Sequence, residues 1–271
     1  MNLELDNLHV LITGGSKGIG LACARGFLAE GARVTLVART METLLAAQTS
    51  LMAMVVNAGT AGTPSRVNVI AADLRDAADA ERAVETVERD FGPVDVLVNS
   101  AGASKRTPAA ELTAASWHDA MQAKFFTYIH VINPLIKKMG ERGRGAVVNV
   151  IGSGGKVAAV THLAGGSANA ALMLASAGFA AAYAGKGVRV NAVNPGLTLT
   201  ERLHEGMQAE ARQQGISLEE ALTRAKATRP LGRIAEPSEI ADAVVYLASN
   251  RASYVTGAVL AMDGAVTPMV V

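Results

Sequence analysis

Residues 9–20, HVLITGGSKGIG, decide the fold of this chain. The first five form a short apolar run typical of a buried strand, and residues 20–30 continue with helical spacing up to Gly31. Glycines between them let the backbone turn sharply, and the helix that follows offers free N–H groups to an anion. A strand, a glycine loop and a helix in this order predict a nucleotide-binding unit rather than a structural turn.

Strand-like and helix-like segments alternate along the rest of the chain. Strands are predicted over residues 33–38, 67–72, 94–99, 146–151, 188–193 and 258–262. Helices are predicted over residues 41–56, around 80–91, over 114–139 with a disturbance at Pro134, and over 237–248, with residues 57–65 as a loop. Parallel strands need helical crossovers, so the pattern predicts one doubly wound α/β (Rossmann) domain over residues 1–271, with about seven mostly parallel strands and helices on both faces. Ligands of such a sheet bind beyond the carboxyl ends of its strands.

Composition excludes several classes of protein. Half of the 271 residues are apolar, 18% are charged and the net charge is +1, which excludes a disordered chain and leaves no basic surface for nucleic acid or an anionic membrane. The single cysteine, Cys23, cannot form an internal disulfide, and no cysteine–histidine spacing predicts a metal site. Residues 1–6 lack the apolar core of a signal peptide. We therefore expect a cytoplasmic protein.

Residues 157–185 contain no charged side chain and are long enough to span a membrane. They consist largely of Gly, Ala and Ser, with His162 and Asn169 among them, rather than of Leu, Ile and Phe. Because small residues let a helix approach another backbone closely, we interpret this segment as a buried helix, or one at a subunit interface, and not as a membrane span.

Two basic residues bear on the choice of dinucleotide. An acid after the second strand would bind the ribose 2′-hydroxyl of NAD(H), whereas this chain has Ala38 and Arg39 there. Arg39 and Lys17, with no acid opposing them, can both face a 2′-phosphate, so NADP(H) is favoured over NAD(H). The alternative is a pair of solvated surface cations.

Six ordered motifs resemble those of the short-chain dehydrogenase/reductase family over nearly the whole chain. Residues 13–20 match its TGxxxGxG loop, Asp73-Leu74 resembles its adenine-contacting segment, and residues 99–102, NSAG, are similar to its NNAG segment. Residues 190–196, VNAVNPG, and the tail with PLGR (230–233), YVTG (254–257) and Asp263-Gly264 are equally similar.

The resemblance implies a cofactor site and a homotetramer, to which the small-residue helix is suited. Thr198 and Thr200 would reach the nicotinamide carboxamide. The remaining cofactor-binding residues implied are Gly14, Ser16, Lys17, Gly18, Ile19, Gly20, Asp73, Leu74, Asn99, Ala101, Gly102, Pro195 and Gly196.

The resemblance fails where the family's reaction takes place. Its proton donor is a tyrosine, and a lysine four residues later lowers the tyrosine's pKa and holds the ribose. Residues 167–172, SANAAL, align with the family's YxASKAAL so that Gly165 falls at the tyrosine and Asn169 at the lysine. The family's helical asparagine falls on Lys124, while Gly152 and Ser153 compete for its serine position. Asn169 can still donate hydrogen bonds to a ribose.

Reduction of a carbonyl needs a proton or a strong hydrogen bond for the developing alkoxide, so another group must supply it. Lys124 is one candidate, with Tyr128 on the same helix face as a phenol whose ionisation the cation would favour. His162 is another, because an imidazole titrates near neutrality, and Ser153 could bind the substrate oxygen. The alternatives are a solvated lysine, a core tyrosine and a structural histidine.

Three functions remain open from the sequence. The first is an NADP(H)-dependent oxidoreductase that acts on a small carbonyl or alcohol substrate with a non-standard proton donor. The second is a dinucleotide-binding sensor or partner subunit without redox turnover, and the third is a non-redox enzyme that uses Lys124 or His162. Residues 201–229 are predicted to be the variable substrate lid, and Leu203, Met207 and Ala211 at helical spacing there indicate a partly apolar substrate.

Overall fold

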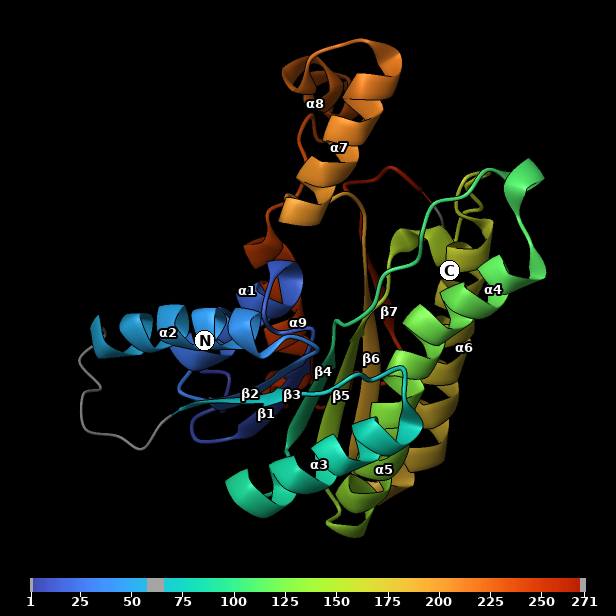
Figure 1. Cartoon of the computed structure of the whole chain (residues 1–271). Coiled ribbons are helices and arrows are strands. Elements are labelled where there is room, and N and C mark those ends of the chain that lie inside the picture. Colours follow the sequence, from blue (N-terminus) through green and yellow to red (C-terminus); the bar gives the residue numbers. More distant parts are fainter. Residues whose placement is uncertain (1, 58–65, 269–271) are drawn as a thin grey trace.

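One parallel sheet forms the centre of the molecule in the computed structural model, which describes residues 2–57 and 66–268 (Figure 1). Within these residues seven strands lie in the order β3-β2-β1-β4-β5-β6-β7, and every neighbouring pair is parallel. They are β1 (His9–Thr13), β2 (Arg33–Ala38), β3 (Val67–Ala71), β4 (Val96–Asn99), β5 (Gly145–Val150), β6 (Val188–Pro195) and β7 (Val259–Met262). The predicted doubly wound sheet is confirmed. Strand order reverses between β1 and β4, which is where such folds bind ligands.

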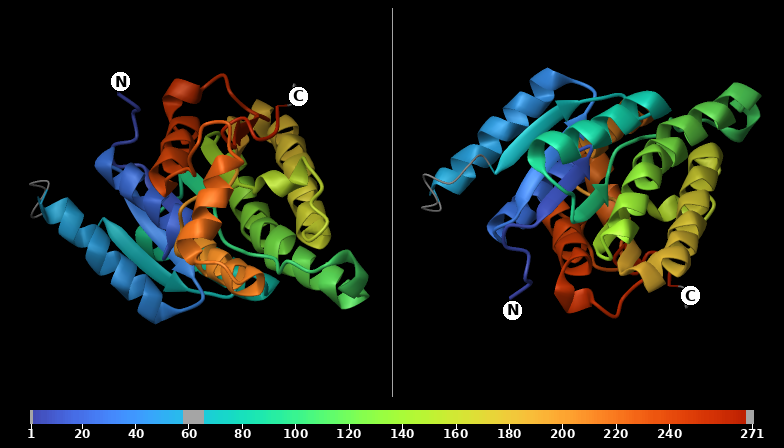
Figure 2. Two further views of the ribbon diagram at one scale, coloured as in Figure 1. Left: turned by 90° about the horizontal axis from the view of Figure 1, so that it is seen from above. Right: turned by 90° about the horizontal axis from the view of Figure 1, so that it is seen from below.

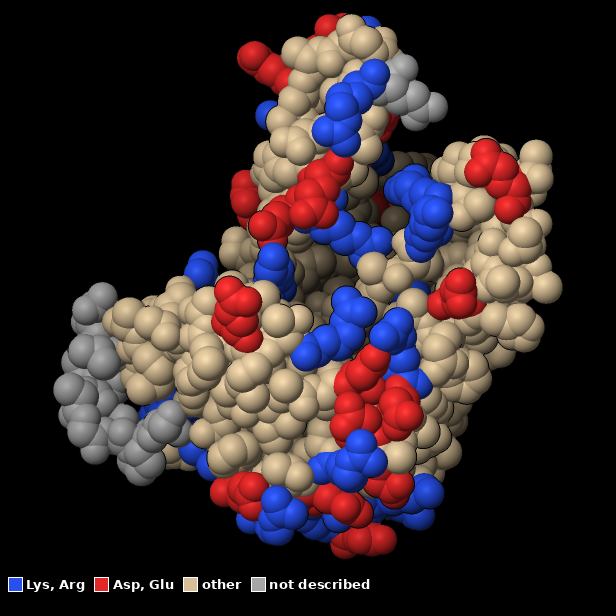
Figure 3. Space-filling view, in the orientation of Figure 1, with Lys and Arg blue, Asp and Glu red and all other residues tan. Residues whose placement is uncertain are grey.

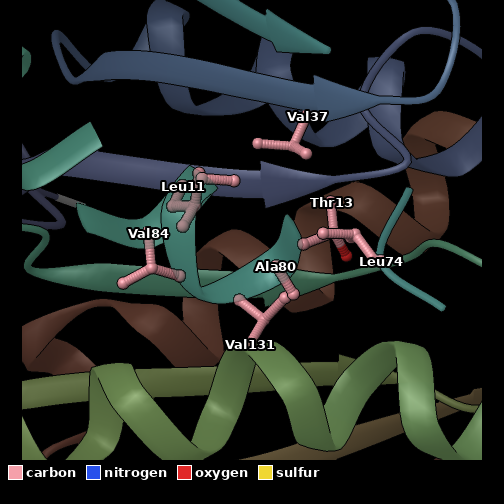
Figure 4. Close-up of a pocket in the computed structure, with 8 residues that line it drawn as sticks. Leu11, Thr13, Val37, Leu74, Ala80, Val84 and Val131 are labelled. Atoms are coloured by element: carbon pink, nitrogen blue, oxygen red, sulfur yellow. The ribbon is translucent and has the colours of Figure 1, made fainter. Parts of the chain in front are cut away.

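Helices cover both faces of the sheet (Figure 2). One layer contains α1 (Gly18–Ala29), α2 (Met41–Asn57) and α9 (Pro237–Ala248), and the other contains α3 (Ala77–Phe91), α5 (Thr127–Glu141) and α6 (Leu163–Tyr183). Figure 4 shows the packing of the second layer, where Leu11 and Val37 of the strands face Val84 of α3 and Val131 of α5. Two further helices, α7 (Glu201–Gln214) and α8 (Leu218–Ala227), project above the carboxyl ends of the strands (Figure 1).

The helix predicted over residues 114–139 is interrupted, but not at Pro134. It consists of α4 (Ala114–Ala120), a π-helical segment η2 (Met121–Phe126) and α5, which contains Pro134 without a break. The interruption lies against the exit of β4, where a Cβ on Gly102 would be 2.2 Å from the carbonyl oxygen of Ala123. This tertiary contact, and not the proline, marks the position of the irregular turn.

The loop predicted over residues 57–65 begins one residue later than expected, because Asn57 ends α2. Residues 58–65 lie outside the described residues, so the remainder of that prediction is untested.

Among the described residues, one helix is long and apolar enough to cross a membrane by length and composition, namely Leu163–Lys186 with a mean hydropathy of 1.2. A core helix of a globular protein passes the same test. This helix packs against β6 and η2, and it buries Ala168, Leu172 and Ala180. The predicted helix is present, but it is only partly buried, with 44% of its apolar window inside the molecule, and its place at a subunit interface stays a prediction.

Candidate functional site

The glycine loop between β1 and α1 lies where the strand order reverses. Gly14 has φ +67°, and a Cβ at this position would lie 2.8 Å from the Cα of Ala101 in the exit of β4. A Cβ on Gly20 would lie 2.3 Å from the carbonyl oxygen of Gly14. The side chain of the N-cap residue, Lys17, does not cap α1, so the first N–H groups of the helix are left to face the loop. This backbone cradle fits the diphosphate of a dinucleotide.

A chain of buried polar side chains holds the strand exits together. The Thr13 hydroxyl donates to Asn99 Oδ1 at 3.1 Å and accepts from the N–H of Ser100 at 3.2 Å. Asn99 Nδ2 donates to Asn149 Oδ1 at 3.0 Å, and Asn149 Nδ2 donates to the Ser176 hydroxyl at 2.9 Å. Asn99, which the resemblance places at the cofactor, therefore aligns β1, β4, β5 and α6 through its side chain.

The basic residues near the glycine loop differ in their partners. Lys17 Nζ lies 2.8 Å from Glu201 Oε2 at the start of α7, so the expectation that no acid opposes Lys17 is wrong. The two residues are 184 positions apart, and only folding brings them together. Arg39 is exposed and makes no ion pair or hydrogen bond within the part of the chain that the structure describes. The Arg75 guanidinium on Asp73 lowers the pKa of that carboxyl to about 2.

The imidazole of His162 fills the space beside Gly165. His162 is the N-cap residue of α6, and a Cβ built on Gly165 would lie 2.3 Å from His162 Cε1 and 2.7 Å from Nε2. The same Cβ would lie 1.9 Å from the Ser104 hydroxyl. The ring and this hydroxyl thus occupy the place from which any side chain at position 165 would start. Asn169 lies on the next turn, with Nδ2 3.3 Å from the place of a Cβ on Gly152.

Several buried polar atoms at this point have no partner. Within residues 2–57 and 66–268, Ser104 Oγ, His162 Nδ1 and Asn169 Oδ1 are buried and make no hydrogen bond. Buried polar atoms are otherwise almost always paired, because an unmade hydrogen bond costs about 1–3 kcal/mol. The Ser104 hydroxyl and the His162 ring both adjoin Gly165, and Asn169 lies one turn further along α6, so the three unpaired atoms indicate a site whose partners are supplied by a ligand.

Positive charge gathers at the same place. Burial, with a contribution from Arg202, lowers the pKa of Lys124 to about 8. Burial also lowers the pKa of His162, and Arg106, Lys124 and Arg202 lower it further. Lys124 comes from η2, which packs against α6. The structure therefore brings together two of the predicted proton donors, Lys124 and His162, from segments that are distant in sequence.

Tyr128 is buried in the core, which favours the alternative of a core tyrosine over a catalytic phenol. Its hydroxyl donates to the carbonyl oxygen of Val150 at 2.6 Å, and burial raises the pKa of the phenol. Ser153 lines a hollow with Lys156, Asn194 and Asp263, and none of the hydrogen bonds within residues 2–57 and 66–268 joins its hydroxyl to His162. Cys23 is buried in α1, and burial raises the pKa of its thiol to about 12, as expected for a core cysteine.

The threonines after β6 are already engaged within the chain. Thr200 caps α7 by accepting from the N–H of Leu203, and the Thr198 hydroxyl donates to the carbonyl oxygen of Gly196. A methyl of Thr200 lies 3.3 Å from the place of a Cβ on Gly18, so this segment lies against the glycine loop.

Sequence reasoning missed Ser104, Arg106 and Arg202. All three follow strand exits, Ser104 and Arg106 after β4 and Arg202 after β6. The rule that ligands bind beyond the carboxyl ends of strands could have selected them, as it selected Arg39.

Comparisons with known proteins show relatives over nearly the whole chain. A family model described as enoyl-(acyl carrier protein) reductase matches residues 14–267. The chain is 33% identical to the D-threitol dehydrogenase of Mycolicibacterium smegmatis over 98% of this chain and 95% of that protein. The structure of L-sorbose reductase from Gluconobacter frateurii, complexed with NADPH and L-sorbose, is similar with a TM-score of 0.92 and 29% identity, and the similarity covers 100% of both chains.

A further similar structure is that of a protein with an unusual catalytic centre. It is an NADPH-bound short-chain oxidoreductase from Pseudomonas aeruginosa that is described as containing an atypical catalytic centre. It is 30% identical, with a TM-score of 0.86, over 98% of this chain and 100% of that one. The family match and the identities over nearly the full length show that this chain belongs to the short-chain dehydrogenase/reductase family and is an oxidoreductase.

Proposed function

We propose that the protein interconverts an alcohol and its carbonyl compound with NADP(H), and that His162 takes the part of the family's tyrosine. The observation that carries the proposal is the position of the His162 ring, 2.3 Å from where a Cβ on Gly165 would lie. The ring occupies the space of the missing side chain and brings a titratable group to it.

The cofactor part of the proposal rests on the glycine cradle and on Arg39. The free N–H groups of α1 would bind the diphosphate, and the exposed Arg39 would bind the 2′-phosphate by charge-assisted hydrogen bonds. Lys17 contributes less than expected because Glu201 holds it. The NADPH complexes of the two similar structures support the same choice. Such a cofactor, when bound, takes up or delivers the hydride.

The lowered pKa of His162 suits it to exchange a proton with the substrate oxygen. In alcohol oxidation the neutral imidazole takes the hydroxyl proton as the carbon loses a hydride, and in carbonyl reduction the protonated ring returns that proton. Lys124, with a pKa of about 8, stays mostly protonated at pH 7, and its ammonium stabilises the developing alkoxide. Asn169 replaces the family's lysine as a neutral hydrogen-bonding group toward a ribose, and its unpaired Oδ1 is available for this.

A second candidate function is dinucleotide binding without turnover. It is favoured by the absence of a charge at Asn169 and of a side chain at Gly165. The two functions are separated by following NADPH absorbance with a panel of sugars, polyols, ketones and aldehydes. We expect at least one compound of the panel to oxidise NADPH in the presence of the wild-type protein. The kcat/KM of His162→Ala should be about 10²–10⁴-fold lower than that of the wild type, while its Kd for NADPH is unchanged. Tight NADPH binding without any turnover would establish the second function.

We further propose that residues 201–229 close over the substrate and that the protein is a homo-oligomer. The first part is supported by the position of α7 and α8 above the strand exits (Figure 1), and the second by the small residues of α6 and its Leu174, which is 78% exposed. Light scattering with Leu174→Glu tests the second part. A lower mass than the wild type is expected, and a monomeric wild type would contradict it.

A further inference from the structure

The site contains more positive charge than hydride and proton transfer require. Burial lowers the pKa values of Lys124, His162 and Arg202, and repulsion among these groups and Arg106 lowers them further. None of the four groups makes an ion pair with a carboxylate in the described ranges, 2–57 and 66–268. The chain contains nearly equal numbers of acids and bases, 24 and 25, so this local excess is a property of the site.

Backbone contacts place the two arginines beside His162. The N–H of Thr107 donates to the carbonyl oxygen of Thr161 at 2.9 Å, so Arg106 and His162 flank one hydrogen bond between two loops. Arg202 Nη2 donates to the carbonyl oxygen of Ser104 at 3.3 Å, and the Ser104 hydroxyl lies against position 165. The Arg202 guanidinium is therefore held beside Ser104, and the Arg106 guanidinium is close enough to His162 to lower its pKa.

The guanidiniums also remain available to a ligand. Arg106 and Arg202 are exposed as residues, but the Arg202 guanidinium is partly buried where it donates to the carbonyl oxygen of Ser104, and this burial lowers its pKa. Glu205 attracts Arg202 at longer range without forming an ion pair. Figure 3 shows Lys and Arg side chains around a hollow between the α7–α8 projection and the body of the molecule. A cationic group in such a hollow is solvated poorly and repelled by its neighbours, and a bound anion removes both costs.

We propose that Arg106 and Arg202 bind an anionic group of the substrate, a carboxylate, so that the protein acts on oxo or hydroxy acids. Two planar guanidiniums provide bidentate donors that match a carboxylate. The inference rests on the proposed function, because it names the substrate class of the same site. The N–H groups of α1 would bind the diphosphate of the cofactor, whereas Arg202 donates to Ser104 and both arginines act on His162.

The test measures binding without turnover. Protein saturated with NADP⁺ cannot reduce a ketone, so the Kd of 2-oxobutanoate, 3-oxobutanoate and 4-oxopentanoate can be measured calorimetrically beside that of their methyl esters. We expect at least one acid to bind at least about 10-fold more tightly than its ester, as a charge-assisted hydrogen bond provides. Equal Kd values for every acid and ester would overturn the proposal.

Variants locate the binding groups. Arg106→Ala and Arg202→Ala should each weaken binding of the acid by about 10- to 100-fold and leave the Kd for NADP⁺ unchanged. Arg202→Lys keeps the charge but loses the planar guanidinium, so it should weaken binding of the acid by less than Arg202→Ala does. It replaces Arg202→Ala in this test if the alanine variant does not fold. Arg212→Ala, on the same helix, is the matched control and should bind the acid as the wild type does. A loss of NADP⁺ binding in the two arginine variants would assign them to the cofactor and overturn the proposal.

The outcomes separate this inference from the proposed function. If the acid binds through the arginines but no acid oxidises NADPH, the anion site stands and the redox function falls. If NADPH is oxidised equally well by an acid and its ester, the redox function stands and the anion site falls.

Discussion

Gly165→Ala is the sharpest perturbation of the proposed centre, because it adds one methyl group where the structure has no room. The new Cβ would lie 1.9 Å from the Ser104 hydroxyl and 2.3 Å from His162 Cε1. Both are ends of side chains, so they can move away, and the stability cost is that of modest overpacking, about 1–3 kcal/mol. Alanine in place of glycine in a helix returns about 1 kcal/mol. The net change in the free energy of unfolding is therefore small, at most about 2 kcal/mol.

Activity should change far more than stability. A ring displaced from its productive position loses the proton-transfer contribution, about 10²–10⁴-fold in kcat/KM. The assay is NADPH oxidation with the best compound of the panel, beside thermal unfolding of the same preparation. Gly185→Ala is the matched control, because a Cβ there meets nothing within 4 Å. If Gly165→Ala retained wild-type kcat/KM, the His162 ring would not be the catalytic group.

Four further variants test other parts of the site. Lys124→Met removes a group whose pKa falls from 10.5 to about 8 on folding, so the wild type pays about 3 kcal/mol below pH 8 to keep this lysine protonated in the folded state, and the cost disappears as pH rises to 10.5. Denaturant titrations should therefore show the variant more stable than the wild type at pH 7 and equally stable near pH 10. A difference in stability that does not change with pH would contradict the lowered pKa. Tyr128→Phe loses the hydrogen bond to Val150, so the free energy of unfolding should fall by about 1–3 kcal/mol while kcat stays within about twofold, and a large loss of kcat would restore a catalytic role to the phenol. Arg39→Ala should weaken NADPH by about 10- to 100-fold and NADH little, whereas Lys17→Ala should have the smaller effect; equal losses for the two cofactors would refute the preference for NADP(H).

The sheet could be predicted from the sequence because it depends on local periodicity. Short apolar runs followed by glycine, such as residues 9–13, predict strands, and the parallel order follows from the helical crossovers between them. The irregular turn at Met121–Phe126 could not be predicted in this way. Its position coincides with a contact between Gly102 and Ala123, which no local pattern encodes.

The site could be predicted only in part, for the same reason. His162 and Lys124 were candidates by residue type, yet their approach to each other depends on the packing of η2 against α6. The pairing of Lys17 with Glu201 joins positions 184 residues apart, so a sequence window that shows an unopposed cation is misleading. Tyr128 shares a helix face with Lys124 in a regular helix, but its hydroxyl is directed to Val150 in the core.

The central claim, that His162 lies with a lowered pKa where a nicotinamide cofactor binds, can be measured directly without knowing the substrate. The chain has five histidines, so NMR of protein labelled at histidine Cε1 gives five resonances, and His162→Gln identifies the one that matters. We expect this resonance to titrate below pH 6.5 in the free protein and to shift when NADPH saturates it. A resonance that titrates at 6.5 and does not move with saturating NADPH would contradict the account.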